Sequence, residues 1–567
     1  MNKKQYLKRL YVVSFFVALF ALFIIVRLFL LQVVNGESYK NKAERSYIQA
    51  VDTFERGTIF FSKRNGDRIS AATVTTGFRV IMHTGQIDSP ESLLDSLSDI
   101  LDIDEEDFLR KASKDNDPHE VIADKITKNT ADQIDALDLP GIRMERQKWR
   151  FYPGGQMAAQ TLGFVAYKGD DRIGQYGVER TYNGTLSRKE DELYINFFAE
   201  VFSGLSSSFS GEEREGDIIT TIEPNVQAFL EQELVKLDDK WGSDASGGII
   251  LNPTTGEILA MASTPTFDLN SFSSVDDSAV YRNPLVENVF EFGSVIKPLV
   301  MAIGIEKGVV TADTTYYDAG YVDVGKDRVY NYDKKGRGTV SMQEVLNQSL
   351  NTGMVLVQQK LDKKDFKEYM KAYGFGEKSG VELPNEALGL VSNLDSARDI
   401  ENATAAFGQG IAFSPMVAAR AFSALANGGT IIEPHLVKEI DYKDGGKDVT
   451  EIPEGRRVIT KEASEEVSRM LVELVDTALF AGREKLDRHT IAGKTGTAQI
   501  AGPNGGYLEG QNLHTFFGYT PAYDPEFLVV LFTKHPRGAL YASQTVAPAS
   551  METIKFLLQY YEVPPDR

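Results

Sequence analysis

The chain has 567 residues, of which 42% are hydrophobic and 25% charged, a composition typical of folded globular protein. Its net charge of −20 argues against a protein that mainly binds nucleic acid. The chain contains no cysteine, which excludes disulfides, thiolate zinc sites and iron–sulfur clusters. Its histidines are scattered without close pairs, so we predict neither a metal site nor a cofactor.

The N-terminal segment has the pattern of a membrane anchor. Four basic residues lie within the first nine, and an apolar run then extends from Leu10 to Val34, broken only by Arg27. As a helix this run would span roughly 37 Å, against a hydrocarbon core of about 30 Å. A cleaved signal peptide, the alternative, would have a shorter apolar run that ends in small residues. We therefore predict one uncleaved span, with residues 1–9 in the cytoplasm and everything after the span outside.

Residues 35–215 are polar and rich in turns, and we predict that they form a separate pedestal domain. The stretch "SLLDSLSDILDIDEEDFLRKA" (92–112) is typical of short helices joined by an acidic turn. The Ser/Gly/Glu-rich stretch 202–217 is the best candidate for a linker. A second domain would then occupy residues 216–567.

Regular patterns are clearer in this second domain. A helix is predicted to begin at Pro224, because apolar residues follow it at helical spacing. The stretch "GGIILNPTTGEILAMAS" predicts a hairpin with its turn at Pro253–Gly256. The later predicted elements are an amphipathic helix over 464–480 and strands over 514–519 and 527–533. This order favours an α+β fold in which an antiparallel sheet is packed between helices.

The first candidate for chemistry is Ser294-Val295-Ile296-Lys297. Residues three apart on a helix share a face, so the lysine amine would lie near the serine hydroxyl. A serine nucleophile needs an adjacent base. A lysine serves as that base only when burial or nearby positive charge lowers its pKa. Taken alone, an N-capping serine beside an exposed lysine explains the pattern better.

Two further motifs follow along the chain. Ser349-Leu350-Asn351 places a hydroxyl and an amide where an extended or turn backbone would direct both into one cleft. The third motif lies in a β-prone run and consists of Lys494, Thr495, Gly496 and Thr497. Its glycine permits close approach of a ligand, and its lysine would meet the terminal carboxylate of a peptide paired to the strand edge. Taken alone, the second motif is better explained by a polar turn, and the third by a charge-protected edge strand.

The ordered combination of the three motifs resembles that of the penicillin-binding proteins and β-lactamases. The stretches "RGTIF" (56–60), "RFYPGGQMAAQTLGFV" (150–165) and "GQYGVERTYNGTL" (174–186) are similar to pedestal motifs of the class B, monofunctional penicillin-binding proteins of the division type. No segment resembles the glycosyltransferase module found in other penicillin-binding proteins. Phe292 departs from the resemblance, because proline is common at this position.

The resemblance implies a penicillin-binding transpeptidase domain on an elongated mixed pedestal, anchored by one transmembrane helix in the plasma membrane. It implies septal D,D-transpeptidation of peptidoglycan stem peptides through a serine acyl-enzyme, and inhibition by β-lactams. The residues implied as catalytic are Ser294, Lys297, Ser349, Asn351 and Lys494, and those implied as substrate-binding are Thr495, Gly496 and Thr497. A membrane glycan polymerase and other division proteins are the implied partners.

Three alternatives share the motifs. An elongation-type transpeptidase would carry out the same reaction elsewhere on the cell. A serine D,D-carboxypeptidase or β-lactamase would admit water to the ester, and such hydrolases usually lack a long segment between anchor and catalytic domain. A β-lactam sensor would need several membrane spans and a cytoplasmic effector, whereas this sequence predicts one span.

Overall fold

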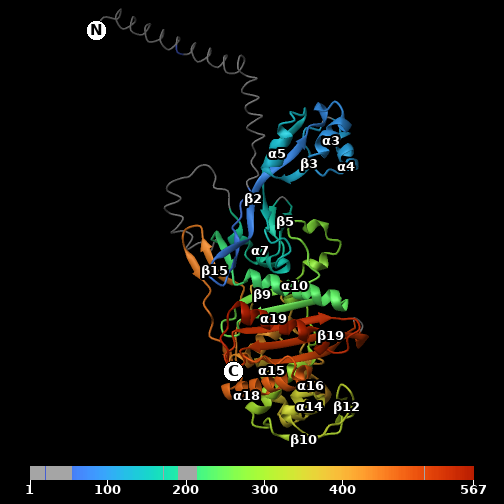
Figure 1. Ribbon diagram of the computed structural model, residues 1–567, viewed down its shortest axis with the longest axis vertical. Helices are drawn as coiled ribbons and strands as arrows, with labels where there is room; N and C mark the ends of the chain where they lie inside the picture. Colours follow the sequence, from blue (N-terminus) through green and yellow to red (C-terminus); the bar gives the residue numbers. More distant parts are fainter. Residues whose placement is uncertain (1–19, 21–53, 116, 170, 189–213, 503–504) are drawn as a thin grey trace, which may run out of the picture. The chain divides into compact units, whose positions relative to one another are not determined.

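The computed structural model describes residues 20, 54–115, 117–169, 171–188, 214–502 and 505–567 (Figure 1). The predicted anchor and cytoplasmic tail lie outside this part of the chain except for one residue, as does most of the predicted linker. Within the described part, no helix is both long enough and apolar enough to cross a membrane. The chain forms two compact units. The smaller contains Val74–Trp149, and the larger contains Arg56–Thr73 and Arg150–Arg567.

The smaller unit is a short sheet with three helices. Its strands are β2 (Arg68–Met82, whose first residues belong to the larger unit), β3 (Glu120–Ile126) and β4 (Ile142–Phe151), and its helices are α3 (Pro90–Ser98), α4 (Glu105–Ala112) and α5 (Lys128–Asp135). β2 pairs with both β3 and β4. Ser89 and Asp104 cap α3 and α4 through their side-chain oxygens. The two short helices predicted over 92–112 are therefore confirmed.

The larger unit begins with a mixed sheet, in which β1 (Ile59–Ser62) pairs antiparallel with the start of β2 and parallel with β7 (Gly216–Thr220). β7 also pairs with β15 (Val437–Tyr442), which pairs with β16 (Lys447–Val449). The short elements beside it are β5 (Val165–Lys168), β6 (Asp171–Gly174), α6 (Ala159–Leu162), α7 (Gly177–Thr181) and α8 (Asn183–Leu186).

Three segments that the sequence analysis singled out meet at one buried carboxylate. Arg56 Nε donates to Glu179 Oε2 at 2.6 Å, and Arg150 Nε donates to Glu179 Oε1 at 2.6 Å. Burial disfavours the ionised form of Glu179, but the charges of Arg150 and Arg56 outweigh burial and lower its pKa. This buried cluster joins chain segments that lie up to 123 residues apart.

A five-stranded antiparallel sheet forms the centre of the larger unit. Its order is β18 (Ala492–Ala501), β19 (Tyr507–Thr520), β20 (Phe527–Lys534), β8 (Ala245–Leu251) and β9 (Ile258–Thr264). β8 and β9 are the predicted hairpin, and β19 and β20 contain the two later predicted strands. β20 is buried on both faces because helices cover both sides of the sheet.

Helices α10 (Pro224–Trp241) and α19 (Val546–Tyr560) pack together on one side of this sheet, where the rings of Phe229 and Phe556 stack at 4.0 Å (Figure 1). On the other side lie α17 (Pro415–Ala426) and α18 (Lys461–Glu473), with α12 (Lys297–Glu306) against α18 (Figure 1). The remaining helices are α11 (Pro284–Glu287), α13 (Met342–Asn347), α14 (Asn351–Lys360), α15 (Lys363–Ala372) and α16 (Asp399–Ala405). The remaining strands are β10 (Thr315–Asp318), β11 (Tyr321–Val324), β12 (Asp327–Tyr330), β13 (Gly338–Ser341), β14 (Thr430–Ile431) and β17 (Arg456–Arg457). The predicted antiparallel sheet between helices is thus confirmed.

The helix predicted over 464–480 is only partly correct. α18 begins three residues earlier and ends at Glu473, and a π-helical turn follows over Leu474–Ala478. Phe480 and Ala481 then adopt left-handed backbone angles, with φ of 51° and 54°. Apolar periodicity continues through this stretch, so the pattern alone could not reveal the break.

Candidate active site

The turn that carries Ser294 is a 3₁₀ turn, Gly293–Ile296, that leads into α12. Gly293 has a φ of +66°, and a Cβ atom there would lie 2.8 Å from the carbonyl oxygen of Thr497. Glycine is therefore required both by the backbone angle and by the closeness of the neighbouring strand. Phe292 is buried and stacks on Phe413 at 5.1 Å, so an aromatic contact anchors the turn at the position where proline is common.

Lys297 is the first residue of α12 and is 0% exposed. Its Nζ donates to the Ser349 carbonyl oxygen at 2.6 Å and contacts Ser349 Oγ at 3.1 Å. Within the described part of the chain, no hydrogen bond joins Lys297 Nζ to Ser294 Oγ. Burial and the positive charge of Lys494 hold the pKa of Lys297 well below its usual range. Both effects favour the neutral amine, the state that a general base requires.

The second motif lies at the turn before α14. Ser349 has a φ of +55°, an uncommon angle for serine, and this conformation accompanies the contact of its carbonyl oxygen with Lys297. Its Oγ also accepts a hydrogen bond from Lys494 Nζ at 3.1 Å. Asn351 begins α14, and its Nδ2 donates to the carbonyl oxygen of Tyr330 at 3.0 Å. Ser349 Oγ is therefore the atom that the two lysine amines share.

The third motif lies on β18, at the edge of the five-stranded sheet. Lys494 is 3% exposed, and burial lowers its pKa to about 7. A Cβ atom on Gly496 would lie 2.5 Å from the Phe292 carbonyl oxygen, so only glycine lets the strand approach the Ser294 turn this closely. Thr497 Oγ1 accepts a hydrogen bond from the backbone N–H of Ala542 at 3.1 Å.

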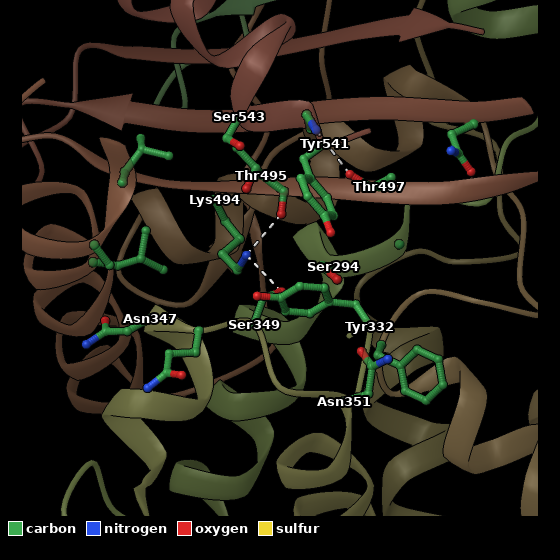
Figure 2. Close-up of a pocket in the computed structure, with 18 of the residues that line it drawn as sticks. Ser294, Tyr332, Asn347, Ser349, Asn351, Lys494, Thr495, Thr497, Tyr541 and Ser543 are labelled. Carbon is green, nitrogen blue, oxygen red and sulfur yellow. Dashed lines mark hydrogen bonds between the residues drawn. The ribbon is translucent and has the colours of Figure 1, made fainter. Parts of the chain in front are cut away.

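These motifs line one cleft of about 600 Å³ (Figure 2). Ser294, Ser349, Asn351, Lys494, Thr495 and Thr497 all contribute to its wall, Lys297 lies buried beneath it, and Gly496 lies within the β18 segment that forms one side. In Figure 2 the hydroxyl of Ser294 faces the cleft between β18 and the Ser349 turn. The structure thus places all eight predicted site residues together.

Several cleft residues were not predicted from the sequence. Tyr332 and Tyr541 approach across the opening, with ring centroids 5.8 Å apart. Apolar residues in and after the π-helical turn line part of the cleft wall, and these are Leu474, Ala478, Leu479 and Phe480. Amide side chains line other parts of the wall, and these are Gln409, Gln499 and Asn512. No local motif marks these positions, because only the fold brings them beside Ser294.

The geometry suits acyl transfer. The Ser294 hydroxyl lines the same cleft as Ser349, whose own hydroxyl connects the buried amine of Lys297 to Lys494. The edge strand β18 offers backbone groups to an extended peptide. Because the pKa of Lys494 lies at about 7, a bound carboxylate would favour its protonated form. One lysine would then act as base and the other as cation.

Comparison with known families agrees with this geometry. The family model of the penicillin binding protein transpeptidase domain matches residues 247–554, more than half of the chain. The chain belongs to this transpeptidase family. The penicillin-binding protein dimerisation domain matches residues 53–197, so the resemblance inferred from the pedestal motifs of this penicillin-binding protein is confirmed as well.

Relatives of this penicillin-binding protein extend over most of its length. Stage V sporulation protein D of Bacillus subtilis is 31% identical over 95% of this chain and 83% of its own length. The peptidoglycan D,D-transpeptidase FtsI of Escherichia coli is 26% identical over 78% of this chain and 73% of its own. Among solved structures, penicillin-binding protein 3 of Mycobacterium tuberculosis with aztreonam has a TM-score of 0.68 at 22% identity, covering 91% of this chain and 98% of its own. This similarity supports the assignment of the same fold to the present chain.

Proposed function

We propose that this protein is a peptidoglycan D,D-transpeptidase that cross-links stem peptides during septal cell-wall synthesis and is inhibited by β-lactams. The observation that carries the proposal is the arrangement around Ser349 Oγ, which contacts the amines of Lys297 and Lys494 beside Ser294. The names of relatives support the reaction, since FtsI of Escherichia coli and PenA of Neisseria gonorrhoeae are both described as peptidoglycan D,D-transpeptidases, PenA as a probable one.

In the first half-reaction Ser294 Oγ attacks the carbonyl carbon of the penultimate D-alanine of a donor peptide. Lys297 accepts the hydroxyl proton and returns it through Ser349, which delivers a proton to the nitrogen of the terminal D-alanine and is reprotonated by Lys297 as the C–N bond breaks. The terminal D-alanine leaves with its nitrogen protonated, and an ester links the remaining peptide to Ser294. The backbone N–H groups of Ser294 and Thr497 stabilise the oxyanion.

Substrate binding is assigned to the other site residues. Lys494, Thr495 and Thr497 hold the terminal carboxylate of the donor, and Asn351 binds its peptide amide. Gly496 keeps β18 close enough for the donor to pair with the strand edge. In the second half-reaction the amine of an acceptor peptide attacks the ester, forms the cross-link and releases Ser294. The ester conserves the energy of the original amide, so no nucleotide is needed.

Intact mass after benzylpenicillin treatment tests the nucleophile. The wild-type chain should gain the mass of one penicillin, and Ser294→Ala should gain none. Ser543→Ala is the matched control, because Ser543 lines the same cleft, and it should be labelled like the wild type. A labelled Ser294→Ala variant would overturn the assignment. A stable adduct favours the transpeptidase, whereas rapid loss of the adduct with release of hydrolysed penicillin favours a carboxypeptidase or β-lactamase.

The setting of the reaction is also part of the proposal. A single helix over residues 10–34 anchors the chain in the plasma membrane, residues 35–215 form a pedestal, and residues 216–567 form the transpeptidase domain outside. The pedestal contacts a membrane glycan polymerase and other division proteins. Deletion of Val74–Trp149, the compact unit within the pedestal, should abolish co-purification with such a polymerase, and unchanged co-purification would reject this role.

The septum could be that of ordinary division or that of sporulation. The similarity to stage V sporulation protein D favours a role in sporulation as a second candidate, with the same chemistry. Depletion of the protein distinguishes the two. A division role predicts filamentous growing cells, whereas a sporulation role predicts normal growth and defective spores.

A further inference from the structure

Two tyrosines lie side by side on an exposed hairpin of the larger unit. Tyr321 on β11 pairs directly with Tyr330 on β12, and their ring centroids are 6.3 Å apart. The residues are 42% and 44% exposed, whereas Val324 and Val329 of the same hairpin are buried. The hairpin therefore has an inner apolar face packed on the core and an outer aromatic face. Paired exposed aromatic rings are typical of surfaces that bind a ligand.

Neighbouring charges hold these rings in place. The Arg328 guanidinium lies 4.0 Å from the centre of the Tyr321 ring, and its Nε donates to Asp323 Oδ1 at 2.6 Å. Lys334 Nζ lies 5.7 Å from the centre of the Tyr330 ring. Cation–π contacts and the ion pair restrict the rings, so less conformational entropy is lost when a ligand binds.

The aromatic surface continues into the catalytic cleft. The backbone carbonyl oxygen of Tyr330 holds the side chain of Asn351, and Tyr332, which is 55% exposed, lines the cleft opposite Tyr541 (Figure 2). The end of β12 therefore lies beside Asn351 at the cleft, and two residues beyond Tyr330 the chain reaches Tyr332 in the cleft wall. We name Tyr321, Tyr330 and Tyr332 the tyrosine path.

We propose that the tyrosine path binds the glycan strand to which a stem peptide is attached, an inference that rests on the proposed function. The peptide occupies the cleft, so the sugars joined to it must lie outside the cleft but close to its mouth. The C–H faces of pyranose rings are apolar and pack on aromatic rings, while their hydroxyl and N-acetyl groups accept and donate hydrogen bonds. The tyrosine rings match the apolar faces of the sugars, and Asp323, Arg328 and Lys334 beside them match the hydrogen-bonding groups of the sugars.

Charge favours a neutral sugar over a strongly charged partner. Arg328 is already paired with Asp323 through two hydrogen bonds, at 2.6 and 3.1 Å, so this ion pair carries little net charge and Lys334 adds one positive charge beside it. An acidic or basic protein segment would find no unpaired opposite charge at this ion pair. If this surface binds a protein and not a glycan, the wild type will show no binding of the glycan probe in the experiment below.

The test is binding of tetra-N-acetylchitotetraose, a soluble β-1,4-linked N-acetylhexosamine probe, to the full chain in detergent, measured by isothermal titration calorimetry. Tyr321→Ala should weaken binding by about tenfold, the loss expected when a central aromatic contact is truncated. Tyr321→Phe keeps the ring and should bind within about twofold of wild type. Tyr167→Ala is the matched control, because Tyr167 is also exposed and lies 5.1 Å from an arginine, Arg172, in an unrelated part of the unit.

The outcomes separate this inference from the proposed function. Absence of binding by the wild type up to about 10 mM probe, or equal weakening by Tyr321→Ala and Tyr167→Ala, would overturn the glycan site. Thermal unfolding of each variant shows whether Tyr321→Ala is folded, and the Tyr321→Phe result decides the case if it is not. Penicillin labelling of Ser294 is read in parallel. Labelled wild type without probe binding refutes the glycan site alone, whereas absent labelling refutes the proposed function.

Discussion

Burial and the charge of Lys494 together lower the pKa of Lys297, so the charge of Lys494 should shift the pH at which the enzyme becomes active. The Nζ atoms of Lys297 and Lys494 each lie 3.1 Å from Ser349 Oγ, so they are at most about 6 Å apart. At this distance, with an effective dielectric constant of about 20, two positive charges repel by roughly 2.8 kcal/mol, or about 2 pKa units. Removing the Lys494 charge by Lys494→Gln should therefore raise the pKa of Lys297 toward its ordinary value.

Because Lys297 must be neutral to accept a proton, acylation should fall about tenfold per pH unit below its pKa. In Lys494→Gln the acidic limb of the acylation rate should move to higher pH by about 1–2 units, in addition to a general loss of affinity for the carboxylate. The assay is stopped-flow acylation by a fluorescent penicillin between about pH 5 and 9.

The position of the limb, not the size of the rate, tests the reasoning. Lys438→Gln removes an exposed lysine and is the matched control, with an unchanged profile expected. A limb that stays in place or moves to lower pH in Lys494→Gln would show that the repulsion does not hold Lys297 neutral.

Two further substitutions test the turn at the nucleophile and the buried ion cluster. Gly293→Ala should lower the acylation rate at least 100-fold, because its Cβ would lie 2.8 Å from the Thr497 carbonyl oxygen. Gly308→Ala is the control, since Gly308 has a similar φ but open space around it, and it should cost only about 1–2 kcal/mol of stability. Equal acylation rates of the two variants would refute the steric argument. Glu179→Gln should lower the free energy of unfolding by about 3–5 kcal/mol in urea, since it leaves buried arginines unpaired. Because the folded-state pKa of Glu179 is lowered, its stabilisation should be complete at neutral pH and disappear as pH falls through that pKa, and a flat acid profile would contradict this.

The sequence was sufficient where chemistry or periodicity is local. The hairpin of β8 and β9 follows from alternating apolar runs around Pro253–Gly256, and the three motifs supply the side chains of the cleft. The sequence was not sufficient where a distant contact decides the backbone. No glycine or proline precedes Gly482 at the end of α18, so the local sequence does not mark where the helix ends. The π-helical turn that follows contains Asp476, which forms an ion pair with Arg567, 91 residues further along the chain.

The same limit applies to the lysines. The helical spacing of three residues predicted that the Lys297 amine lies near Ser294. In the structure the amine donates to the carbonyl oxygen of Ser349, a residue with a left-handed backbone angle. Nothing in the local sequence around Ser349 requires that angle. Likewise, Tyr332 and Tyr541 are more than two hundred residues apart, and only the completed fold brings their rings together.

The place of β18 at the border of its sheet has a consequence for drug escape. The N–H and C=O groups along that border belong to the main chain, and no exchange of one amino acid for another, apart from proline, removes them. An inhibitor that binds through these backbone groups would keep its hydrogen-bond partners after almost any single substitution in β18. Reduced susceptibility would then have to arise by displacing the entire strand or by altering the rings and amides around the entrance.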